Sequence, residues 1–547
     1  MTYILGVNAG SYTYHDAAAC VVDGRGEILA FIEEERLSRI RHAPNVRFPI
    51  FAVARCLQLA AIDPGEIDAV AVGWNEPRHH RLGDGRWAFD SPRELLAALG
   101  IQRSRLPDVY FVPHHLAHAV SAFYGSDFEE AAVAVVDGNG EDESTSIYRA
   151  QRGQPLIRLE RWPQIHSLGH LYEAASDWLG LGKRGAGKTM GLAAYGADLD
   201  LDDPGWIVPL GDQLISALGD DARADYESTR PRWRKRISDY AGASGPRHRA
   251  AELHMDGTAV RVATAVQRTT EHVMRWLTDR ARALANTESL CLAGGVGLNC
   301  AANGLLPQPV YVPPVPHDAG VALGAAWSLV PPRTAQLLSP FTGGAPGNAE
   351  AGREIGASQP LDVDSVAELL LRGAVVGICR GRSEVGPRAL CHRSLLASPV
   401  HVDMRDHMNR VKRREGWRPF GPVTHGPSDL WKPTGFLERY MIGATTLTDS
   451  GEGTIPAVRH VDGTTRPQQL MREDERFIAD VLDELVKRGH PPVLLNTSFN
   501  GPGEPIVETA DQALRCAARL GVDAVVAEED LVLFSGAVGG DVDAAAS

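Results

Sequence analysis

Four residues at three places in the chain could together hold a divalent metal ion. His114 and His118 are four positions apart, so on a helix they share one face and can bind one cation. Asp137 follows an apolar strand-like run, and Asp318 follows a proline-rich segment and opens an apolar helix. Ligands of open α/β sheets gather at the carboxyl ends of strands, so a mixed nitrogen and oxygen site for iron, zinc or manganese is conceivable. A polar helix start, a glycine turn or an N-cap would give each of these features as well.

Two further features of the first half of the chain could take part in a reaction. His15 precedes Asp16, and an imidazole that titrates near neutrality is a general base when its role is not structural. The segment 294–299, GGVGLN, follows a short apolar strand predicted over 290–293. Its glycines would let the backbone approach a nucleotide, and a helix N-terminus would favour the phosphate. A tight strand–helix turn shows the same pattern.

Basic and hydroxyl-bearing residues gather in the last third of the chain. The three segments that hold them are 384–390, 412–420 and 496–500. Lysine and arginine together with serine and asparagine donors suit a phosphate-bearing substrate. A basic run usually lies on a solvated helix face, but Trp417 and Phe420 interrupt this one and a Gly-Pro turn follows it.

The elements that would position these residues recur along the first part of the chain. Strands are predicted over 3–8, 16–22 and 27–35, with a hairpin turn at 23–26 and a helix over 50–61. A second apolar strand again ends in an acidic glycine turn, and the strands that belong to this repeat are predicted over 131–136, 144–149 and 156–161. The recurrence favours a duplicated α/β lobe, as in the actin, sugar-kinase and Hsp70 superfold.

The chain has 547 residues, more than one hydrophobic core usually holds, so two domains are expected. The Gly, Ala and Pro-rich stretch 342–357 is the predicted boundary, which gives domains over 1–345 and 358–540. Residues 259–286 form the longest helical pattern, and 198–249 is a charged stretch predicted to be a peripheral insertion. The second domain restarts with a helix over 364–372 and a strand over 374–379.

Composition narrows the class of protein. The net charge of −14 argues against a nucleic-acid binder, which usually carries a basic stripe. The seven cysteines are scattered without a CxxC pair, which fits reduced thiols. No signal-like segment and no apolar run of about 18 residues is visible, so we expect a cytoplasmic protein without a membrane partner. A homodimer is the default expectation for its assembly.

Joined in order, the motifs resemble those of the NodU/CmcH-type O-carbamoyltransferases of nodulation-factor and antibiotic biosynthesis. The match covers nearly the whole chain except the insertion at 198–249. In the first domain it rests on HDAAA from His15, EEERLSR from Glu33, HHLAHA from His114, VDGNGE around Asp137, SLGHLY from Ser167, GKTMGLAAYG from Gly187 and GGVGLNCAANG from Gly294. In the second it rests on GPRAL from Gly386, VKRREGWRPFGP from Val411, RHVDGTTRPQ from Arg459 and LNTSFNGPGEPIV from Leu495.

The resemblance implies a fold and an activity. The fold is α/β, with an N-terminal ASKHA-type domain of duplicated actin- and Hsp70-like lobes, similar to the universal tRNA threonylcarbamoyl-transferase subunit, and a C-terminal YrdC-like α/β domain. In such enzymes carbamoyl phosphate and ATP, with Mg for the ATP, form carbamoyl-adenylate in the second domain. The first domain then transfers the carbamoyl group to a hydroxyl of a small molecule, which we expect to be a sugar hydroxyl of an antibiotic or another natural product.

Site residues are carried over by the same resemblance. One divalent metal, with Fe(II) favoured over Zn or Mn, would be held by His114, His118, Asp137 and Asp318. A neutral His15 would take the proton of the acceptor hydroxyl. The adenylate pocket of the first domain would consist of Gly138, Gly294, Gly295 and Asn299. The catalytic residues of the second domain would be Lys412 and Arg418, and its carbamoyl-phosphate and ATP pocket would add Ser498, Asn500, Arg388 and Arg466.

Two departures from the family pattern and two alternatives remain. Val385 and Cys391 replace the residues usual around the GPRAL segment, and neither is expected to abolish function. A tRNA threonylcarbamoyl-type enzyme could be built on the same two folds, but the acidic charge disfavours it. A non-catalytic ASKHA ATPase or scaffold would need neither a metal nor a carbamoyl-phosphate pocket. The sequence does not identify the acceptor.

Overall fold

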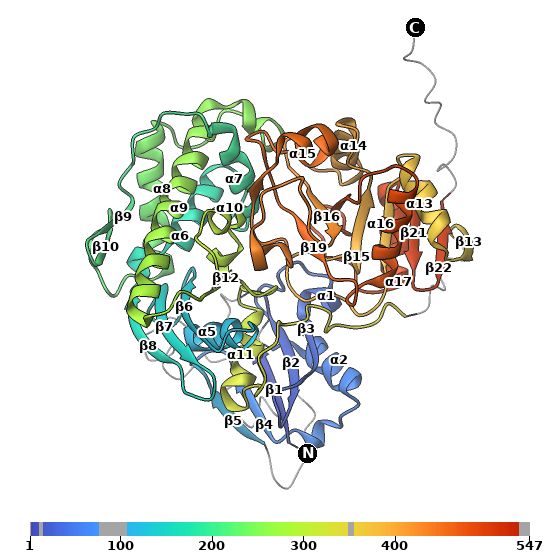
Figure 1. Ribbon diagram of the computed structural model, residues 1–547. Coiled ribbons are helices and arrows are strands. Elements are labelled where there is room, and N and C mark those ends of the chain that lie inside the picture. Colours follow the sequence, from blue (N-terminus) through green and yellow to red (C-terminus); the bar gives the residue numbers. More distant parts are fainter. Residues whose placement is uncertain (1, 10–14, 47, 76–106, 348–354, 535–547) are drawn as a thin grey trace. The chain divides into compact units, whose positions relative to one another are not determined.

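The computed structural model describes residues 2–9, 15–46, 48–75, 107–347 and 355–534 (Figure 1). The chain divides into two compact units. The first comprises Met1–Thr342 together with two short segments from later in the chain, Val385–Pro387 and Thr434–Thr445. The second comprises the rest, Gly343–Glu384, Arg388–Pro433 and Thr446–Ser547. The sequence predicts a single boundary at 342–357, and it does not predict that these two later segments belong to the first unit.

The first unit opens with a five-stranded sheet. Its strands are β1 (Tyr3–Asn8), β2 (Ala18–Asp23), β3 (Ile28–Glu33), β4 (Ala69–Val72) and β5 (Asp108–Phe111), in the order β3-β2-β1-β4-β5. The first three strands form an antiparallel meander, and β4 lies parallel to the central strand β1. Strand β2 is apolar almost throughout because α2 (Ile50–Ala60) packs on one side of it and α11 (Gly320–Leu329) on the other.

A second sheet repeats this plan. Its strands are β6 (Glu130–Val136), β7 (Thr145–Gln151), β8 (Ile157–Trp162), β11 (Leu290–Ala293) and β12 (Val310–Tyr311), in the order β12-β11-β6-β7-β8. Again three strands form an antiparallel meander, and a later strand, β11, lies parallel to the central strand β6. Two lobes with the same strand order are the duplicated topology of the ASKHA superfold, so this fold prediction is confirmed.

Two helices lie between the sheets and pack tightly on each other, α5 (His114–Tyr124) and α11. A Cβ atom on Gly324 of α11 would lie only 1.8 Å from the carbonyl oxygen of Ala117 in α5. A Cβ atom on Gly6 of β1 would likewise lie 2.1 Å from the carbonyl oxygen of Ala322. Glycine therefore lets the backbones approach, and this packing fixes the start of α5 relative to the start of α11.

Helices and one hairpin surround the second lobe. They are α6 (Leu168–Trp178), α7 (Ala186–Ala193), β9 (Ile207–Leu210), β10 (Gln213–Ser216), α8 (Tyr226–Ala241), α9 (Gly257–Ala285) and α10 (Cys300–Gly304). The stretch predicted to be an insertion, 198–249, contains the β9–β10 hairpin and α8, which packs on α6. Only every fourth residue of α8 is buried, Thr229, Trp233, Ile237 and Ala241. Because the buried stripe is this narrow and charged residues surround it, the apolar periodicity that predicts a helix is weak in the sequence.

The second unit is built on an eight-stranded mixed sheet in the order β13-β22-β21-β14-β15-β20-β16-β19. Its strands are β13 (Ala357–Pro360), β14 (Val376–Cys379), β15 (Arg393–Ala397), β16 (Gly421–His425), β19 (Gln468–Leu470), β20 (Leu494–Ser498), β21 (Ala524–Ala527) and β22 (Asp530–Leu533). One apolar cluster contains side chains of α13 (Val363–Leu371) and α16 (Arg476–Lys487), and another those of α14 (Asp403–Val411) and α17 (Ala510–Leu520). Side chains of β14 alternate between the two clusters, so helices cover both faces of the sheet.

The remaining short elements are α1 (Glu34–Ser38), α15 (Asp449–Thr454), β17 (Thr445–Thr446) and β18 (Thr464–Thr465). The likeness of the second unit to YrdC proteins stays a prediction. Within the described part of the chain, no helix combines the length and the apolar composition needed to cross a membrane.

Candidate active site

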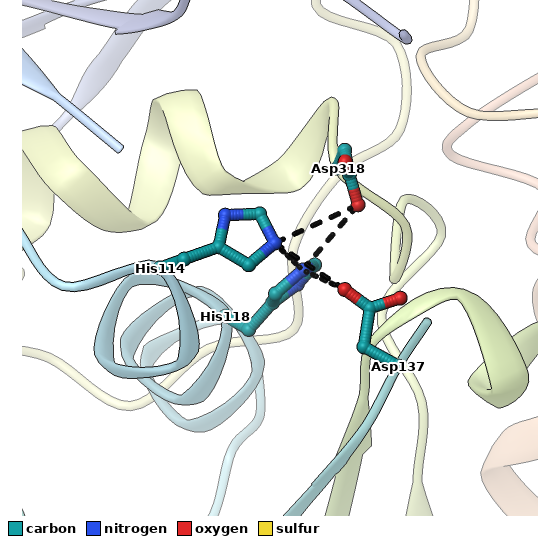
Figure 2. A group of neighbouring side chains, drawn as sticks. All are labelled: His114, His118, Asp137 and Asp318. Carbon is teal, nitrogen blue, oxygen red and sulfur yellow. Dashed lines mark hydrogen bonds and ion pairs between the residues drawn. The ribbon is translucent and has the colours of Figure 1, made fainter. Parts of the chain in front are cut away.

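The four residues singled out as metal ligands converge in the first unit (Figure 2). His114 and His118 project from the first turns of α5, Asp137 directly follows β6, and Asp318 lies just before α11. The two Nε2 atoms are 3.1 Å apart. The Oδ2 atom of Asp137 lies 3.3 and 3.4 Å from them, and the Oδ1 atom of Asp318 lies 3.7 Å from each. All four side chains are buried.

This arrangement fits a metal ion. Ligand atoms bound to one cation at about 2.0–2.2 Å are separated by about 3.0–3.6 Å, close to the distances found here. The Nδ1 atom of His114 donates to the carbonyl oxygen of Gly73 at 3.1 Å, which leaves its Nε2 lone pair directed at the cluster. On the other side, Asp137 accepts a hydrogen bond through Oδ1 from the backbone N–H of Gly295 at 2.9 Å. Each of these contacts orients a ligand from outside the cluster, as in metal sites generally.

The charges of the cluster also favour a cation. Burial raises the pKa of Asp137, but His114 and His118 outweigh it and hold that pKa well below its ordinary value. Burial lowers the pKa of His118, but Asp137 and Asp318 outweigh it and raise that pKa to about 9. Two buried carboxylates thus require positive charge beside them, which a divalent metal would supply.

The third histidine of the same helix start, His115, does not belong to the cluster. Its Nδ1 atom lies 2.7 Å from the hydroxyl of Ser146 on β7, on another side of α5. Burial, followed by the charge of His114, holds the pKa of His115 well below its ordinary value, so this ring is neutral and structural.

The glycine turn at 294–299 adjoins the cluster. Gly294 has φ +89° and ψ 164°, and a Cβ atom there would lie 2.3 Å from the carbonyl oxygen of Val136. Gly138 lies in the turn after Asp137, where the N-terminus of α6 packs closely. A Cβ atom on Gly169 of α6 would lie 2.6 Å from the Cα atom of Gly138.

The side chain of Asn299 caps α10 and forms hydrogen bonds with the side-chain amide of Gln267. The assignment of these residues to an adenylate pocket stays a prediction.

His15 lies beside the end of β1 and is half-buried, with Nδ1 2.7 Å from the Oδ2 atom of Asp16. Burial lowers the pKa of His15, but the charge of Asp16 outweighs it and raises the pKa to about 10. The buried carboxylate thus favours the protonated ring. The role of a neutral His15 as the base stays a prediction. Nε2 is the ring nitrogen that remains for a substrate.

Asn8 connects His15 to the cluster. Its amide nitrogen donates to the carbonyl oxygens of His15 and Asp16, at 3.3 and 3.0 Å. Its amide oxygen accepts the indole N–H of Trp74 at 3.1 Å, and this indole stacks on His114 at a ring-centroid distance of 3.7 Å. Sequence reasoning missed Asn8 and Trp74, although a polar residue at the end of an apolar strand was the available signal.

In the second unit, Lys412, Ser498 and Asn500 lie together. Lys412 is buried at the C-terminal end of α14, and Ser498 ends β20. The Nζ atom of Lys412 donates to the side-chain and backbone oxygens of Asn500, at 2.7 and 2.8 Å, and to the backbone oxygen of Ser498. The hydroxyl of Ser498 donates to the Oδ1 atom of Asn500 at 2.7 Å. The structure thus brings these three residues together, and their role in a carbamoyl-phosphate and ATP pocket stays a prediction.

Arginines gather in the same unit. Burial and then the charge of Arg418 hold the pKa of Arg414 well below its ordinary value, and Arg466 adds to the effect. Three guanidinium groups that repel one another favour an anion among them. Arg418 also faces Glu415 at 3.5 Å. Arg388, half-buried in the turn before β15, stays a predicted member of the pocket.

Two family models match successive parts of the chain. The model described as Carbamoyltransferase N-terminus matches residues 92–327, and the one described as Carbamoyltransferase C-terminus matches residues 367–533. An uncharacterized protein of Synechocystis sp. is 32% identical, over 96% of this chain and 96% of that protein.

Two named relatives extend the comparison. Nodulation protein NolNO of Sinorhizobium fredii is 32% identical, over 95% of this chain and 79% of that protein. The 3'-hydroxymethylcephem-O-carbamoyltransferase of Amycolatopsis lactamdurans is 29% identical, over 94% of this chain and 97% of that protein. The chain is an enzyme of the carbamoyltransferase family.

Proposed function

We propose that this protein is an ATP-dependent O-carbamoyltransferase that acts on a hydroxyl of a small molecule. The observation that carries the proposal is its likeness, over nearly the full length of both chains, to a relative named for transfer to a hydroxymethyl group. Carbamoyl phosphate supplies the carbamoyl group and ATP activates it as carbamoyl-adenylate. A sugar hydroxyl of an antibiotic or another natural product is the proposed acceptor, and no nucleic acid or membrane takes part.

Activation of the carbamoyl group belongs to the second unit in this proposal. A carbamoyl carbon is a poor electrophile because nitrogen donates into its carbonyl, and a mixed anhydride with AMP provides a good leaving group. Lys412 neutralises phosphate charge, and Ser498 and Asn500 hold its Nζ atom in place. Arg418 and Arg466 provide the positive field in which the anionic substrates bind. Mg accompanies the ATP.

Transfer belongs to the first unit. His114, His118, Asp137 and Asp318 would hold one divalent metal, for which we propose Fe(II) ahead of Zn or Mn. When bound, the metal supplies positive charge for the adenylate phosphate. The backbone around Gly294 and Gly138 offers the close approach that a nucleotide needs.

His15 takes the proton of the acceptor hydroxyl at Nε2 in this proposal. Because Asp16 raises its pKa to about 10, the ring must first release a proton, and transfer is then expected to speed up as pH rises towards that value. The ionised Asp16 afterwards stabilises the imidazolium that forms.

The test follows pyrophosphate and AMP with carbamoyl phosphate present or absent, in metal-replete full-length protein. We expect pyrophosphate release that depends on carbamoyl phosphate. Lys412→Ala should lower it by about 10²–10³-fold, the usual effect of losing one group that stabilises developing charge. Lys487→Ala, which removes an exposed lysine of the same unit, is the matched control.

A second variant separates the two steps. His15→Ala should keep carbamoyl-phosphate-dependent pyrophosphate release and lose carbamoylation of hydroxylated acceptors. If both variants lost the same step, the division of labour between the units would be wrong. No dependence on carbamoyl phosphate would point to another acyl donor.

A further inference from the structure

The carboxylate of Asp16 lies between two imidazoles of the first unit. Its Oδ2 atom faces Nδ1 of His15 at 2.7 Å, and its Oδ1 atom faces Nδ1 of His42 at 2.8 Å. Asp16 is buried, whereas the side chains of His15 and His42 are 38% and 27% exposed. Both carboxylate oxygens are thus engaged by rings that also reach towards solvent.

Backbone contacts hold the same three residues in place. The N–H of Asp16 donates to the carbonyl oxygen of His42 at 2.7 Å, and the N–H of His42 donates to the Oε2 atom of Glu35 at 2.6 Å. Asp16 and His42 have φ angles of 57° and 64°, a left-handed conformation that non-glycine residues adopt at a cost. Strain of this kind is retained where the surrounding structure enforces it, often at functional sites.

The ionised carboxylate of Asp16 determines which ring nitrogens of His15 and His42 carry protons. Burial raises the pKa of Asp16, but His15, then His317 and His42, outweigh it and hold that pKa well below its ordinary value. An ionised carboxylate only accepts hydrogen bonds, so the Nδ1 atoms of both rings are donors. Among the described residues, Asp318 and Glu173 also raise the pKa of His15.

We propose that Asp16 and His42 are positioning residues for the transfer step. His42 donates to Oδ1 and fixes the carboxylate. Oδ2 in turn holds the Nδ1 proton of His15, so that the ring releases its other proton from Nε2 and becomes the neutral tautomer that can act as a base there. The inference rests on the proposed function of His15. The acceptor O–H proton passes to Nε2, the acceptor oxygen bonds the carbamoyl carbon, and the bond from that carbon to the AMP oxygen breaks. AMP leaves with the electron pair, and Asp16 stays ionised.

A second reading of the same residues is a metal site. Ligand atoms of Asp16, Glu35 and His42 all lie within 4.8 Å of one another. Both oxygens of Asp16 and one of Glu35 already accept hydrogen bonds, and a cation would have to displace those donors. The geometry therefore favours hydrogen-bonded positioning, and metal content becomes one outcome of the test.

The test compares His42→Asn with His42→Gly in the full-length, metal-loaded protein. Both residues tolerate φ 64°, but only asparagine keeps a side-chain donor. In protein labelled with ¹⁵N-histidine, the Nδ1–H resonance of His15 is assigned by its loss in His15→Gln. We expect the resonance to persist in His42→Asn and to broaden or vanish in His42→Gly. Asp16→Asn should lower the pKa of His15 by about one to three pH units.

Controls and outcomes are distinct. His401→Asn changes an exposed histidine of the second unit and should leave the resonance unchanged. If the Nδ1–H resonance of His15 kept its wild-type shift and line width in His42→Gly, the proposal would be overturned. Two metal equivalents per chain, with one lost in both His42 variants, would replace it with a second metal site.

Kinetics adds a readout that depends on the proposed function. With a carbamoyl acceptor, kcat of His42→Gly should be about 10- to 100-fold lower than kcat of His42→Asn, and KM should not change. This factor corresponds to the loss of one hydrogen bond to a charged group. Equal kcat values for the two variants would count against the proposal. If the wild type transferred nothing to any hydroxyl, the proposed function would fail while the resonance experiment still tested the geometry.

Discussion

Replacement of Gly294 by alanine tests whether the candidate metal site of His114, His118, Asp137 and Asp318 depends on the backbone turn beside it. Gly294 has φ +89° and ψ 164°, a region that only glycine occupies readily. The added Cβ would lie 2.3 Å from the carbonyl oxygen of Val136, so the turn must move away from the end of β6. That movement would pull the N–H of Gly295 from Asp137, to which it donates at 2.9 Å.

The expected cost has two parts. Backbone strain contributes about 1–3 kcal/mol, and loss of a hydrogen bond to a charged group contributes about 1.5–3 kcal/mol. Because the Gly295 contact orients a metal ligand from outside, metal affinity should also fall by about 10- to 100-fold. Gly153→Ala is the matched control, since Gly153 has φ +74° and nothing within 4 Å of an added Cβ. Strain alone should cost that variant about 1–2 kcal/mol.

Thermal unfolding and metal content per chain are the measurements. Gly294→Ala should lower the Tm of the first unit by more than Gly153→Ala and should lose metal at a free metal concentration that saturates the control. If the two variants had equal Tm values and equal metal content, the close approach of the turn to β6 would not support the cluster, and the reasoning would be refuted.

Two further predictions concern the same unit. His118→Ala removes one of four ligand atoms and should lower metal affinity by at least about 10- to 100-fold in a chelator competition, whereas His272→Ala, an exposed histidine of α9, should not. The stability contributed by His15 should be complete below pH 6.5 and lost as pH rises through about 10, because folding raises its pKa. Denaturant unfolding should therefore show stability falling across this range in the wild type and less steeply in His15→Gln; equal slopes would contradict the ion pair with Asp16.

Local rules explain which parts of the site the sequence revealed. His114 and His118 share a helix face because they are four positions apart, and Asp137 follows a short apolar run of the kind that forms buried strands. The strand at 290–293 and the glycine turn after it were predicted in the same way, because a short run of strand-forming residues is followed by glycines. Residues whose position follows from one element and its end were therefore predictable.

Long-range pairing explains what the sequence concealed. His42 contacts Asp16, 26 positions away in the sequence, and both residues adopt left-handed backbone angles. Asp and His adopt such angles more often than most residues, but their sequence does not reveal where they do so. The pKa of His15 depends on its burial and on its sequence neighbour Asp16, then on Asp318 and Glu173, which are far away in the sequence. The segment Thr434–Thr445 joins the first unit through contacts such as the Tyr440 hydroxyl donating to the Leu338 carbonyl oxygen, which no local pattern encodes.

The duplicated topology accounts for why these residues meet at all. In each lobe a central strand and its parallel neighbour, β1 with β4 and β6 with β11, end on the same side of their sheet. At the end of the first pair lie Asn8, the last residue of β1, and Gly73, which follows β4; they anchor the His15 backbone and the Nδ1 atom of His114. Asp137 and Gly294 directly follow the second pair and provide a candidate metal ligand and the turn that orients it. The first lobe thus positions His15, the proposed base, and orients His114, whereas the second positions Asp137, and these strand ends meet at one candidate site.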